Sequence, residues 1–146
     1  MQQTVSPYLC VKGAADALTF YGEVFGAIEM FRMTDPSGDG RLGHAEFRIG
    51  DSVLFIADEY PDFGALSPDS IGGTAVSLHV RVPDCDAVVA AARAEGAVVT
   101  REPADQSFGE RVGQFIDPWG HRWFVAQSIE KVSPEEMQAR WEAEHG

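Results

Sequence analysis

The sequence predicts an α+β fold in which one β-α-β-hairpin unit occurs twice along the 146-residue chain. A strand-like segment, a helical segment and a hairpin follow one another in the same order in both halves. The distance along the chain from the end of the strand to the glycine that ends the helix differs by only one residue between the halves. Two such units create a natural ligand site in the cleft where they face each other. The matching segments are residues 8–11, 11–26 and 49–57 in the first half and 78–82, 82–96 and 116–126 in the second.

In the first half, residues 5–12 alternate as a strand does, and Gly13 begins a helix as a modest cap. Small and apolar residues then recur at helical spacing as far as Gly26, a left-handed stop signal. Gly50-Asp51 suits a two-residue hairpin turn. The remaining predicted segments are a strand at 28–34, a turn-rich loop at 35–40, hairpin strands at 44–49 and 52–57, and a connector at 58–73.

The second half starts near Ala75, and Asp84 is placed to cap a helix that Gly96 closes. Asp, Pro and Gly occupy residues 117–120 in the order that a type I turn favours. In the tail, Ser133-Pro134-Glu135-Glu136 is a capping box that predicts a helix over 134–144. The remaining predicted segments are a strand at 98–101, a polar loop at 102–109 and hairpin strands at 111–116 and 122–127.

Composition narrows the class of protein. A formal net charge of −12, with no basic cluster, argues against a nucleic-acid partner and suits a cationic or polar organic ligand. No apolar run approaches the roughly 18 residues of a membrane span, so no membrane partner is expected. The N-terminus lacks the features of a secretory signal, and Cys10 and Cys85 belong to no metal or redox motif. Cytoplasmic residence with reduced thiols is therefore expected.

Several short motifs are weak alone but specific in combination. They are Phe20-Tyr21, Phe25-Gly26, Gly72-Gly73-Thr74, Phe108-Gly109-Glu110-Arg111, Asp117 to Trp123 and Ser133 to Met137. In these motifs the chain resembles the vicinal oxygen chelate superfamily of glyoxalase I, bleomycin-resistance proteins and extradiol dioxygenases, and more narrowly its PhnB-like, glyoxalase-like branch. The resemblance implies a single domain of paired βαβββ modules that curve into an incomplete eight-stranded barrel, usually in a homodimer.

The implied domain covers residues 1–146 and divides into two modules with a connector and a tail. The first module spans 4–58, the connector 59–73, the second module 74–128 and the helical tail 129–146. The tail helix carries Met137 and Trp141 four residues apart, so this apolar pair is expected to pack on a surface of the same subunit or of a dimer partner.

Metal-dependent members take one ligand from the first and one from the last strand of each module. Carried over by the resemblance, these positions hold Ser6, Phe55, Ser77 and Phe124, which lack the imidazole and carboxylate groups that divalent ions favour. We therefore expect neither the usual metal centre nor any other cofactor. An irregular site for zinc, nickel, iron or manganese, built from His44, Glu46 and His79, is the alternative.

Strand alternation predicts which side chains line the cleft. If Gly50-Asp51 forms the turn, Ile49 pairs with Ser52 and Glu46 with Phe55. Alternate side chains of the paired strands then face away from the helix and toward the cleft. The wall then combines aromatic rings with polar groups, as small-molecule sites do. The predicted ligand-binding residues are Tyr8, His44, Glu46, Arg48, Phe55, Ser77, His79, Arg81, Arg122 and Phe124.

Some of these residues also have specific chemical possibilities. His79 and Glu46 are candidates for a catalytic acid–base pair, although a structural pair is the commoner arrangement. Arg111 is expected to pair with an acidic residue such as Asp105, and His121 to hydrogen-bond backbone near its turn. Cys10 has no base nearby in sequence and is interpreted as a packing residue.

Three classes of function remain open from the sequence. The favoured one is a metal-free protein of the resistance-protein type that encloses a small organic molecule between its modules. The second is an enzyme, either a metal-dependent lyase, isomerase or dioxygenase similar to glyoxalase I, or a metal-free enzyme that uses His79 or Glu46. The third is a structural or interaction module, against which the polar groups predicted on the cleft wall argue.

Overall fold

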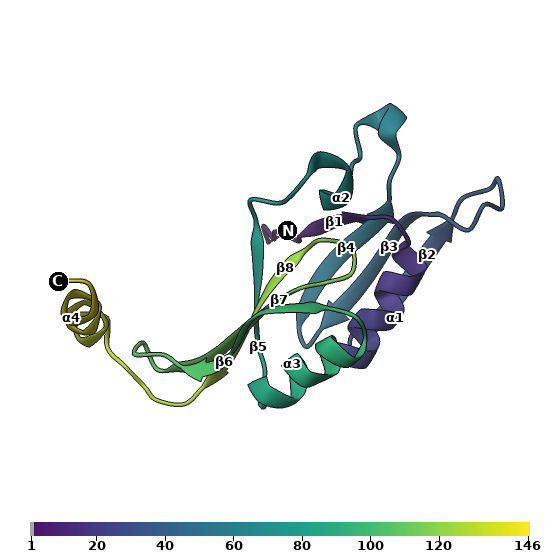
Figure 1. Ribbon diagram of the computed structural model, residues 1–146. Helices are drawn as coiled ribbons and strands as arrows, with labels where there is room; N and C mark the ends of the chain where they lie inside the picture. Colours follow the sequence, from purple (N-terminus) through teal and green to yellow (C-terminus); the bar gives the residue numbers. More distant parts are fainter. Residues whose placement is uncertain (1) are drawn as a thin grey trace. The chain divides into compact units, whose positions relative to one another are not determined.

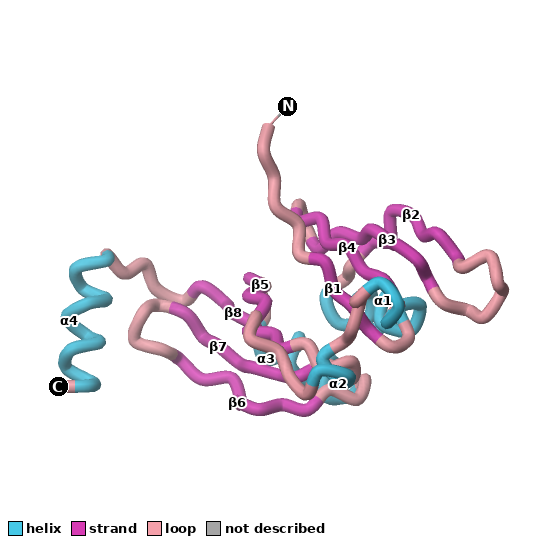
Figure 2. The backbone as a smooth tube through the Cα atoms, turned by 90° about the horizontal axis from the view of Figure 1, so that it is seen from above, coloured by secondary structure: helices cyan, strands magenta, loops and turns pink. Residues whose placement is uncertain are grey.

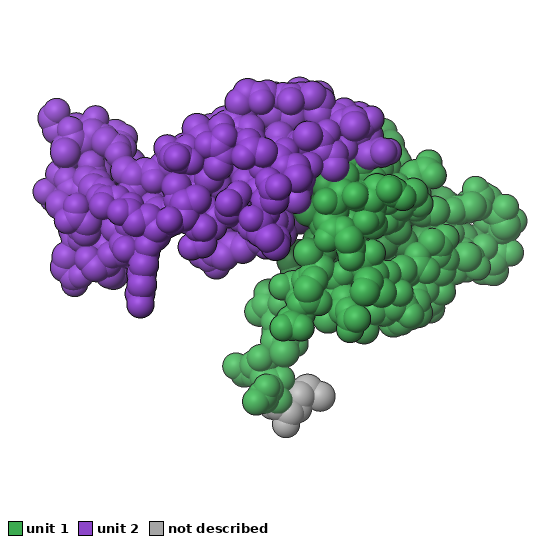
Figure 3. Space-filling view, turned by 90° about the horizontal axis from the view of Figure 1, so that it is seen from below, with its two compact units in different colours: residues 1–75, 117–121 green, residues 76–116, 122–146 purple. Residues whose placement is uncertain are grey.

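The computed structural model describes residues 2–146 and divides into two compact units, which Figure 3 colours separately. Unit 1 comprises the chain up to Ala75 together with Asp117–His121, and unit 2 comprises Val76–Ile116 with Arg122–Gly146. Each unit holds one four-stranded mixed sheet and a helix in the same order along the chain, so the α+β class and the duplicated βαβββ plan are confirmed.

Unit 1 orders its sheet β1-β4-β3-β2, with β1 parallel to β4 and the other neighbours antiparallel (Figure 1). Glu46 pairs with Phe55 and Ile49 with Ser52, which confirms the predicted hairpin register. Helix α1 lies along one face of this sheet (Figure 2). The elements are β1 Tyr8–Val11, α1 Ala14–Phe25, β2 Ile28–Thr34, β3 Leu42–Ile49, β4 Ser52–Asp58, η1 Pro61–Phe63 and α2 Pro68–Ile71.

The core of unit 1 lies between α1 and its sheet. Gly26 ends α1 in the predicted left-handed conformation, and its N–H donates to the carbonyl of Gly22. The ring of Tyr21 stacks on Phe47 at 5.4 Å between centroids. Because strand side chains alternate, this packing directs the intervening residues to the opposite face of the sheet. The buried apolar residues of these elements are Leu9, Val11, Ala14, Ala17, Leu18, Phe20, Tyr21, Val24, Leu42, Ala45, Phe47, Leu54, Ile56 and Ala57.

Unit 2 repeats the plan with the order β5-β8-β7-β6 and with α3 covering one face. Asp84 caps α3 as predicted, because its carboxylate accepts from the Ala87 N–H. Ser133 likewise caps α4 by accepting from the Glu136 N–H, while Met137 and Trp141 stay exposed. The elements are β5 Ser77–Arg81, α3 Cys85–Ala94, β6 Val98–Asp105, β7 Glu110–Ile116, β8 Arg122–Ser128 and α4 Pro134–His145.

The predicted polar loop at 102–109 is wrong in its first half, because β6 continues to Asp105. Pro103 has no N–H to donate to a ladder, but β6 is an edge strand, where a proline is tolerated, and register shifts before Arg101 and before Ala104 accommodate it. The first strand begins at Tyr8, three residues later than predicted, and the short helices η1 and α2 lie within the predicted connector. The other boundaries shift by at most two residues. Within 2–146 no helix has the length and apolar character of a membrane span.

Candidate functional site

The face of the unit 1 sheet that α1 leaves uncovered carries a row of polar and aromatic side chains. Tyr8 on β1 pairs with Phe55 on β4, and Phe55 pairs with Glu46 on β3. His44 lies two residues before Glu46 on the same strand, and so on the same face. Four of the five predicted unit 1 residues are thus neighbours, and the fifth, Arg48, is exposed further along β3.

A hydrogen-bonded chain links three of these side chains. Tyr8 Oη lies 2.7 Å from His44 Nδ1, and His44 Nε2 lies 2.9 Å from Glu46 Oε2. An ionised carboxylate only accepts, so a neutral imidazole carries its proton on Nε2 and leaves Nδ1 to accept the Tyr8 hydroxyl. Partial burial raises the pKa of Tyr8, and Coulombic interactions with the ionised forms of Cys10 and Glu46 raise it further, so the phenol stays protonated at neutral pH.

Aromatic rings surround His44. Its ring centroid lies 5.2 Å from that of Phe55, 5.4 Å from that of Tyr8 and 5.9 Å from that of Phe31. Phe31 was not among the predicted site residues, because β2 reads as an exposed edge strand whose pairing with β3 the sequence alone does not reveal. These rings restrict the orientations open to the imidazole and favour the observed hydrogen bonds.

A pocket of about 750 Å³ opens beside Tyr8. Its walls come from β1, the end of β2, the adjoining loop, β4 and the connector after β4, all of them in unit 1. Rings and aliphatic groups dominate the lining, with carboxylates and hydroxyls interspersed. The lining residues are Tyr8, Cys10, Met33, Thr34, Asp35, Pro36, Gly43, Ala57, Asp58, Tyr60, Phe63, Gly64, Ala65 and Leu66.

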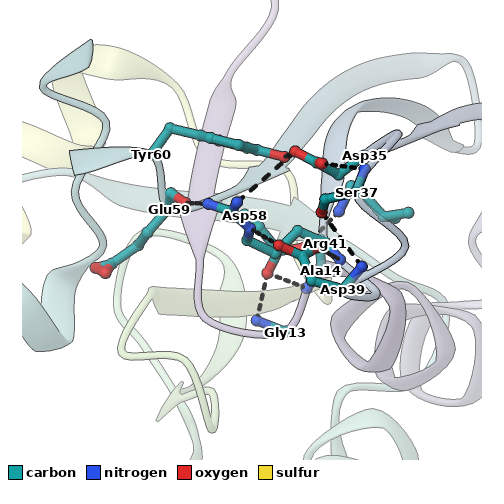
Figure 4. Close-up of polar contacts among 10 residues, drawn as sticks. Gly13, Ala14, Asp35, Ser37, Asp39, Arg41, Asp58, Glu59 and Tyr60 are labelled. Atoms are coloured by element: carbon teal, nitrogen blue, oxygen red, sulfur yellow. Dashed lines mark hydrogen bonds and ion pairs between the residues drawn. The ribbon is translucent and has the colours of Figure 1, made fainter. Parts of the chain in front are cut away.

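One side of the pocket is fixed by a polar cluster (Figure 4). The Tyr60 hydroxyl donates to Asp35 Oδ2 at 2.8 Å, and the Arg41 guanidinium lies 4.3 Å above the Tyr60 ring. Bonds from Ser37 and from Tyr60 lower the pKa of Asp35 to about 2, so this carboxylate is ionised at neutral pH. The cluster thereby ties the loop after β2 to the connector after β4.

Asp58 is a buried carboxylate whose bonds are structural. Its Oδ1 accepts the N–H groups of Gly13 and Ala14 at the start of α1, and its Oδ2 accepts the N–H of Leu42. Figure 4 shows the bonds to Gly13 and Ala14. Three backbone donors thus share one side chain, which joins α1 and β3 to the end of β4. Asp58 therefore lines the pocket as a structural residue, and its carboxylate is not available as a free base.

Three further predictions can be compared with the structure. Arg111 pairs with Asp105 as predicted, and also with Asp86. The His121 N–H bonds within its turn to Asp117 Oδ1, whereas its ring donates to the Cys10 carbonyl. Burial raises the pKa of the Cys10 thiol, and the nearby carboxylates of Glu59 and Asp58 raise it further. A thiol with a raised pKa is a poor nucleophile, in keeping with a packing role.

The predicted unit 2 residues form their own polar row. Arg122 donates to the Ser77 hydroxyl at 3.1 Å, and Phe124 pairs with His79 across the strands. Glu110 attracts both His79 and Arg81, at 3.8 and 3.3 Å. The sequence did not single out Glu110, although alternation along β7 would place it with these residues. A catalytic pair of His79 with Glu46, and a cleft between the modules, stay predictions.

Comparison with known proteins identifies the family. The family model of the Glyoxalase/Bleomycin resistance protein/Dioxygenase superfamily matches residues 2–125 of the chain. A Mycobacterium bovis protein, Mb0911c, is 37% identical over 142 residues, or 95% of this chain and 92% of that protein. The chain belongs to this superfamily.

Two solved structures show that other proteins share the fold. The PhnB protein of Bacillus cereus matches with a TM-score of 0.68 at 21% identity, over 86% of this chain and 100% of that one. FosX, a fosfomycin resistance protein of Listeria monocytogenes, matches with a TM-score of 0.69 at 16% identity, over 93% and 98%. At these identities the likeness concerns the fold alone.

The superfamily's metal centre does not fit the residues present. Ser6, Phe55, Ser77 and Phe124 occupy the positions expected to hold ligands, and phenyl rings and hydroxyls are poor donors for divalent ions. Within residues 2–146, His, Cys, Asp and Glu side chains nowhere gather in threes with a geometry that could hold an ion. The residues at the family's ligand positions therefore do not fit a divalent metal in this chain.

The sequence did not reveal the pocket walls contributed by residues 60–66. That stretch has no periodicity, and its position depends on Glu59, whose Oε1 accepts from the Ser67 N–H and from the hydroxyls of Ser67 and Ser70. These bonds lower the pKa of Glu59 to about 2. The available signal was indirect: aromatic residues spaced among glycines and prolines in a connector between two repeats.

Proposed function

We propose that this superfamily member binds a small organic molecule in the unit 1 pocket beside Tyr8. The observation that carries the proposal is the pocket itself. Its volume of about 750 Å³ lies within the range of roughly 300–1,000 Å³ typical of ligand sites. Its lining combines the rings of Tyr8, Tyr60 and Phe63 with a few polar groups, so stacking supplies affinity and the polar groups set orientation.

Binding without the superfamily metal is part of the proposal. The residues at the four family ligand positions argue for it, because hydroxyls and phenyl rings are poor ligands for the divalent ion that would bind substrate oxygens. FosX, which shares the fold, is named for fosfomycin resistance. We also propose cytoplasmic residence, in line with the two cysteines that form no disulfide, and a homodimer, in line with the family resemblance.

Nile red, an uncharged aromatic dye that fluoresces in apolar sites, provides the test. We expect saturable binding to the wild-type protein and at least tenfold weaker binding to Ala65→Trp, because an indole at this position fills the pocket. Ala139→Trp, on the exposed face of α4, is the matched control and should bind as the wild type does. Equal binding by both variants would refute the proposal.

The competing enzymatic function has its own measurement. A glyoxalase-type lyase would turn over the glutathione hemithioacetal of methylglyoxal when supplied with zinc, nickel, iron or manganese. We expect no turnover above the uncatalysed rate, because the inherited ligand positions offer no nitrogen or carboxylate donor. Metal-dependent turnover would replace the binding function with catalysis.

A further inference from the structure

Resting on the proposed pocket, we infer that Tyr8, His44 and Glu46 together make it selective for organic amines, with the ligand's ammonium group bound at Tyr8 Oη. The direction of the hydrogen bonds at Tyr8 and the charges around the pocket both favour this class of ligand.

With a neutral His44, the carboxylate of Glu46 assigns one direction to the hydrogen-bonded chain. The ionised carboxylate can only accept, so the ring proton lies on Nε2, Nδ1 accepts from Tyr8, and the single phenolic proton points to the ring. The lone pairs of Tyr8 Oη then remain for the ligand, so this oxygen accepts and does not donate. Because the chain ends in a carboxylate, each bond polarises the next, which increases the negative character of the phenolic oxygen.

The rest of the pocket also favours a cation. Its lining contains carboxylates from Asp35 and Asp58 and, among residues 2–146, no lysine, arginine or histidine side chain. Asp35 stays ionised, since its hydrogen bonds lower its pKa to about 2. Arg41 is directed to Asp39, to Asp35 and over the Tyr60 ring, and does not line the pocket.

These features discriminate between classes of ligand. An ammonium group donates to Tyr8 Oη and is attracted by the carboxylates of the lining, and the Tyr8, Tyr60 and Phe63 rings of the lining suit a cation or an aromatic body. An alcohol donates without the charge. A carboxylate would meet acceptors and negative charge, with no cationic partner in the lining. The predicted order of affinity is therefore amine, alcohol, carboxylate.

Displacement of Nile red by three ligands of one shape tests this order. The ligands are 2-(1-naphthyl)ethylamine, 2-(1-naphthyl)ethanol and 3-(1-naphthyl)propionate. For the wild-type protein we expect the amine to bind about tenfold or more tightly than the alcohol, since charge-assisted bonds are roughly twice as strong as neutral ones. The propionate should bind most weakly.

Substitutions at Tyr8 and Glu46 test whether these residues cause the preference for the amine. The amine-to-alcohol affinity ratio should fall at least threefold in Tyr8→Phe, which removes the accepting oxygen and keeps the ring. It should fall similarly in Glu46→Gln, which removes the terminal charge of the chain. Glu29→Gln on the exposed strand β2 changes the net charge equally and is the matched control, with the ratio retained.

The outcomes separate the two proposals. Equal binding of amine and alcohol by the wild type, or an unchanged ratio in Tyr8→Phe and Glu46→Gln, would overturn the amine inference while leaving the pocket intact. Failure of Nile red and of all three naphthyl ligands to bind would instead refute the proposed function itself.

Discussion

Tyr21 in α1 donates its buried hydroxyl to Asp117 Oδ2 across 2.5 Å, although the two residues lie 96 positions apart in the chain. The other oxygen of Asp117 accepts the N–H groups of Trp119 and His121, which shapes the turn. The Trp119 ring meets Phe20 edge-on at 5.5 Å. The turn of the second hairpin is therefore part of the core of unit 1, which explains why this short segment groups with the first half of the chain.

Tyr21→Phe should destabilise the protein by about 1–3 kcal/mol, because it withdraws a donor from a buried carboxylate. Denaturant unfolding followed by circular dichroism measures the change. Tyr60→Phe provides the control, since its bond to Asp35 is only partly buried and should contribute less than about 1 kcal/mol. Equal losses of unfolding free energy in the two variants would show that burial does not make the Tyr21 hydrogen bond more stabilising than the Tyr60 bond.

Asp58→Asn should cost about 2–4 kcal/mol of unfolding free energy. The carboxylate accepts three backbone N–H groups, whereas an amide has one oxygen and turns its NH₂ toward at least one donor. Chemical denaturation gives the value, and Asp51→Asn in the exposed hairpin turn is the control, with a change near zero. A loss below about 1 kcal/mol for Asp58→Asn would show that the fold tolerates rearrangement at the start of α1.

Ser133→Ala should loosen α4 without weakening the rest of the molecule. The substitution removes the side-chain cap on the Glu136 N–H, worth about 1 kcal/mol locally. None of the residues of α4 is buried, so the global unfolding free energy should change little. Hydrogen exchange should therefore quicken over residues 134–145 only. Faster exchange in β6 or β7 as well would show that α4 supports the sheet.

Sequence reasoning succeeded where one local pattern decides the structure. The alternation of β3 and β4, with a glycine-containing turn between them, correctly predicted that Glu46 lies beside Phe55. It placed Tyr8, His44, Glu46 and Phe55 on one face, but it did not predict that Tyr8 and Glu46 bind the same imidazole. That arrangement depends on side-chain reach across β4, which strand alternation alone does not fix.

The pocket was beyond prediction for a different reason. Its outer wall is an irregular segment held by hydrogen bonds to Glu59 and by the contact of Tyr60 with Asp35, and neither interaction leaves a periodic signature. Similarly, the sequence does not show that β6 lies at the edge of its sheet, where the missing N–H of Pro103 is tolerated. Edge or interior position is a property of the whole sheet and could not be read from that segment.

Divalent metals should leave the protein unchanged. A metal at a hundred times its dissociation constant adds about 2.7 kcal/mol of stability, or roughly 5–10 °C in melting temperature for a chain of this length. We expect shifts below about 1 °C with zinc, nickel, iron or manganese relative to EDTA. A larger shift that His44→Gln and His79→Gln both abolish would instead establish the irregular site considered from the sequence.

Glu59 should make a pH-dependent contribution to stability. Its pKa is lowered from 4.5 to about 2 by bonds from Ser67 and Ser70, so the folded state favours the ionised carboxylate. Its stabilising contribution is complete above pH 4.5 and disappears as the pH falls toward about 2. The difference in unfolding free energy between wild type and Glu59→Gln should therefore be constant near neutral pH and shrink across this acidic range. Because both proteins share all other titrating groups, the difference isolates this one carboxylate. A difference that does not change with pH would mean that the carboxylate acts only as a neutral hydrogen-bond acceptor for the connector.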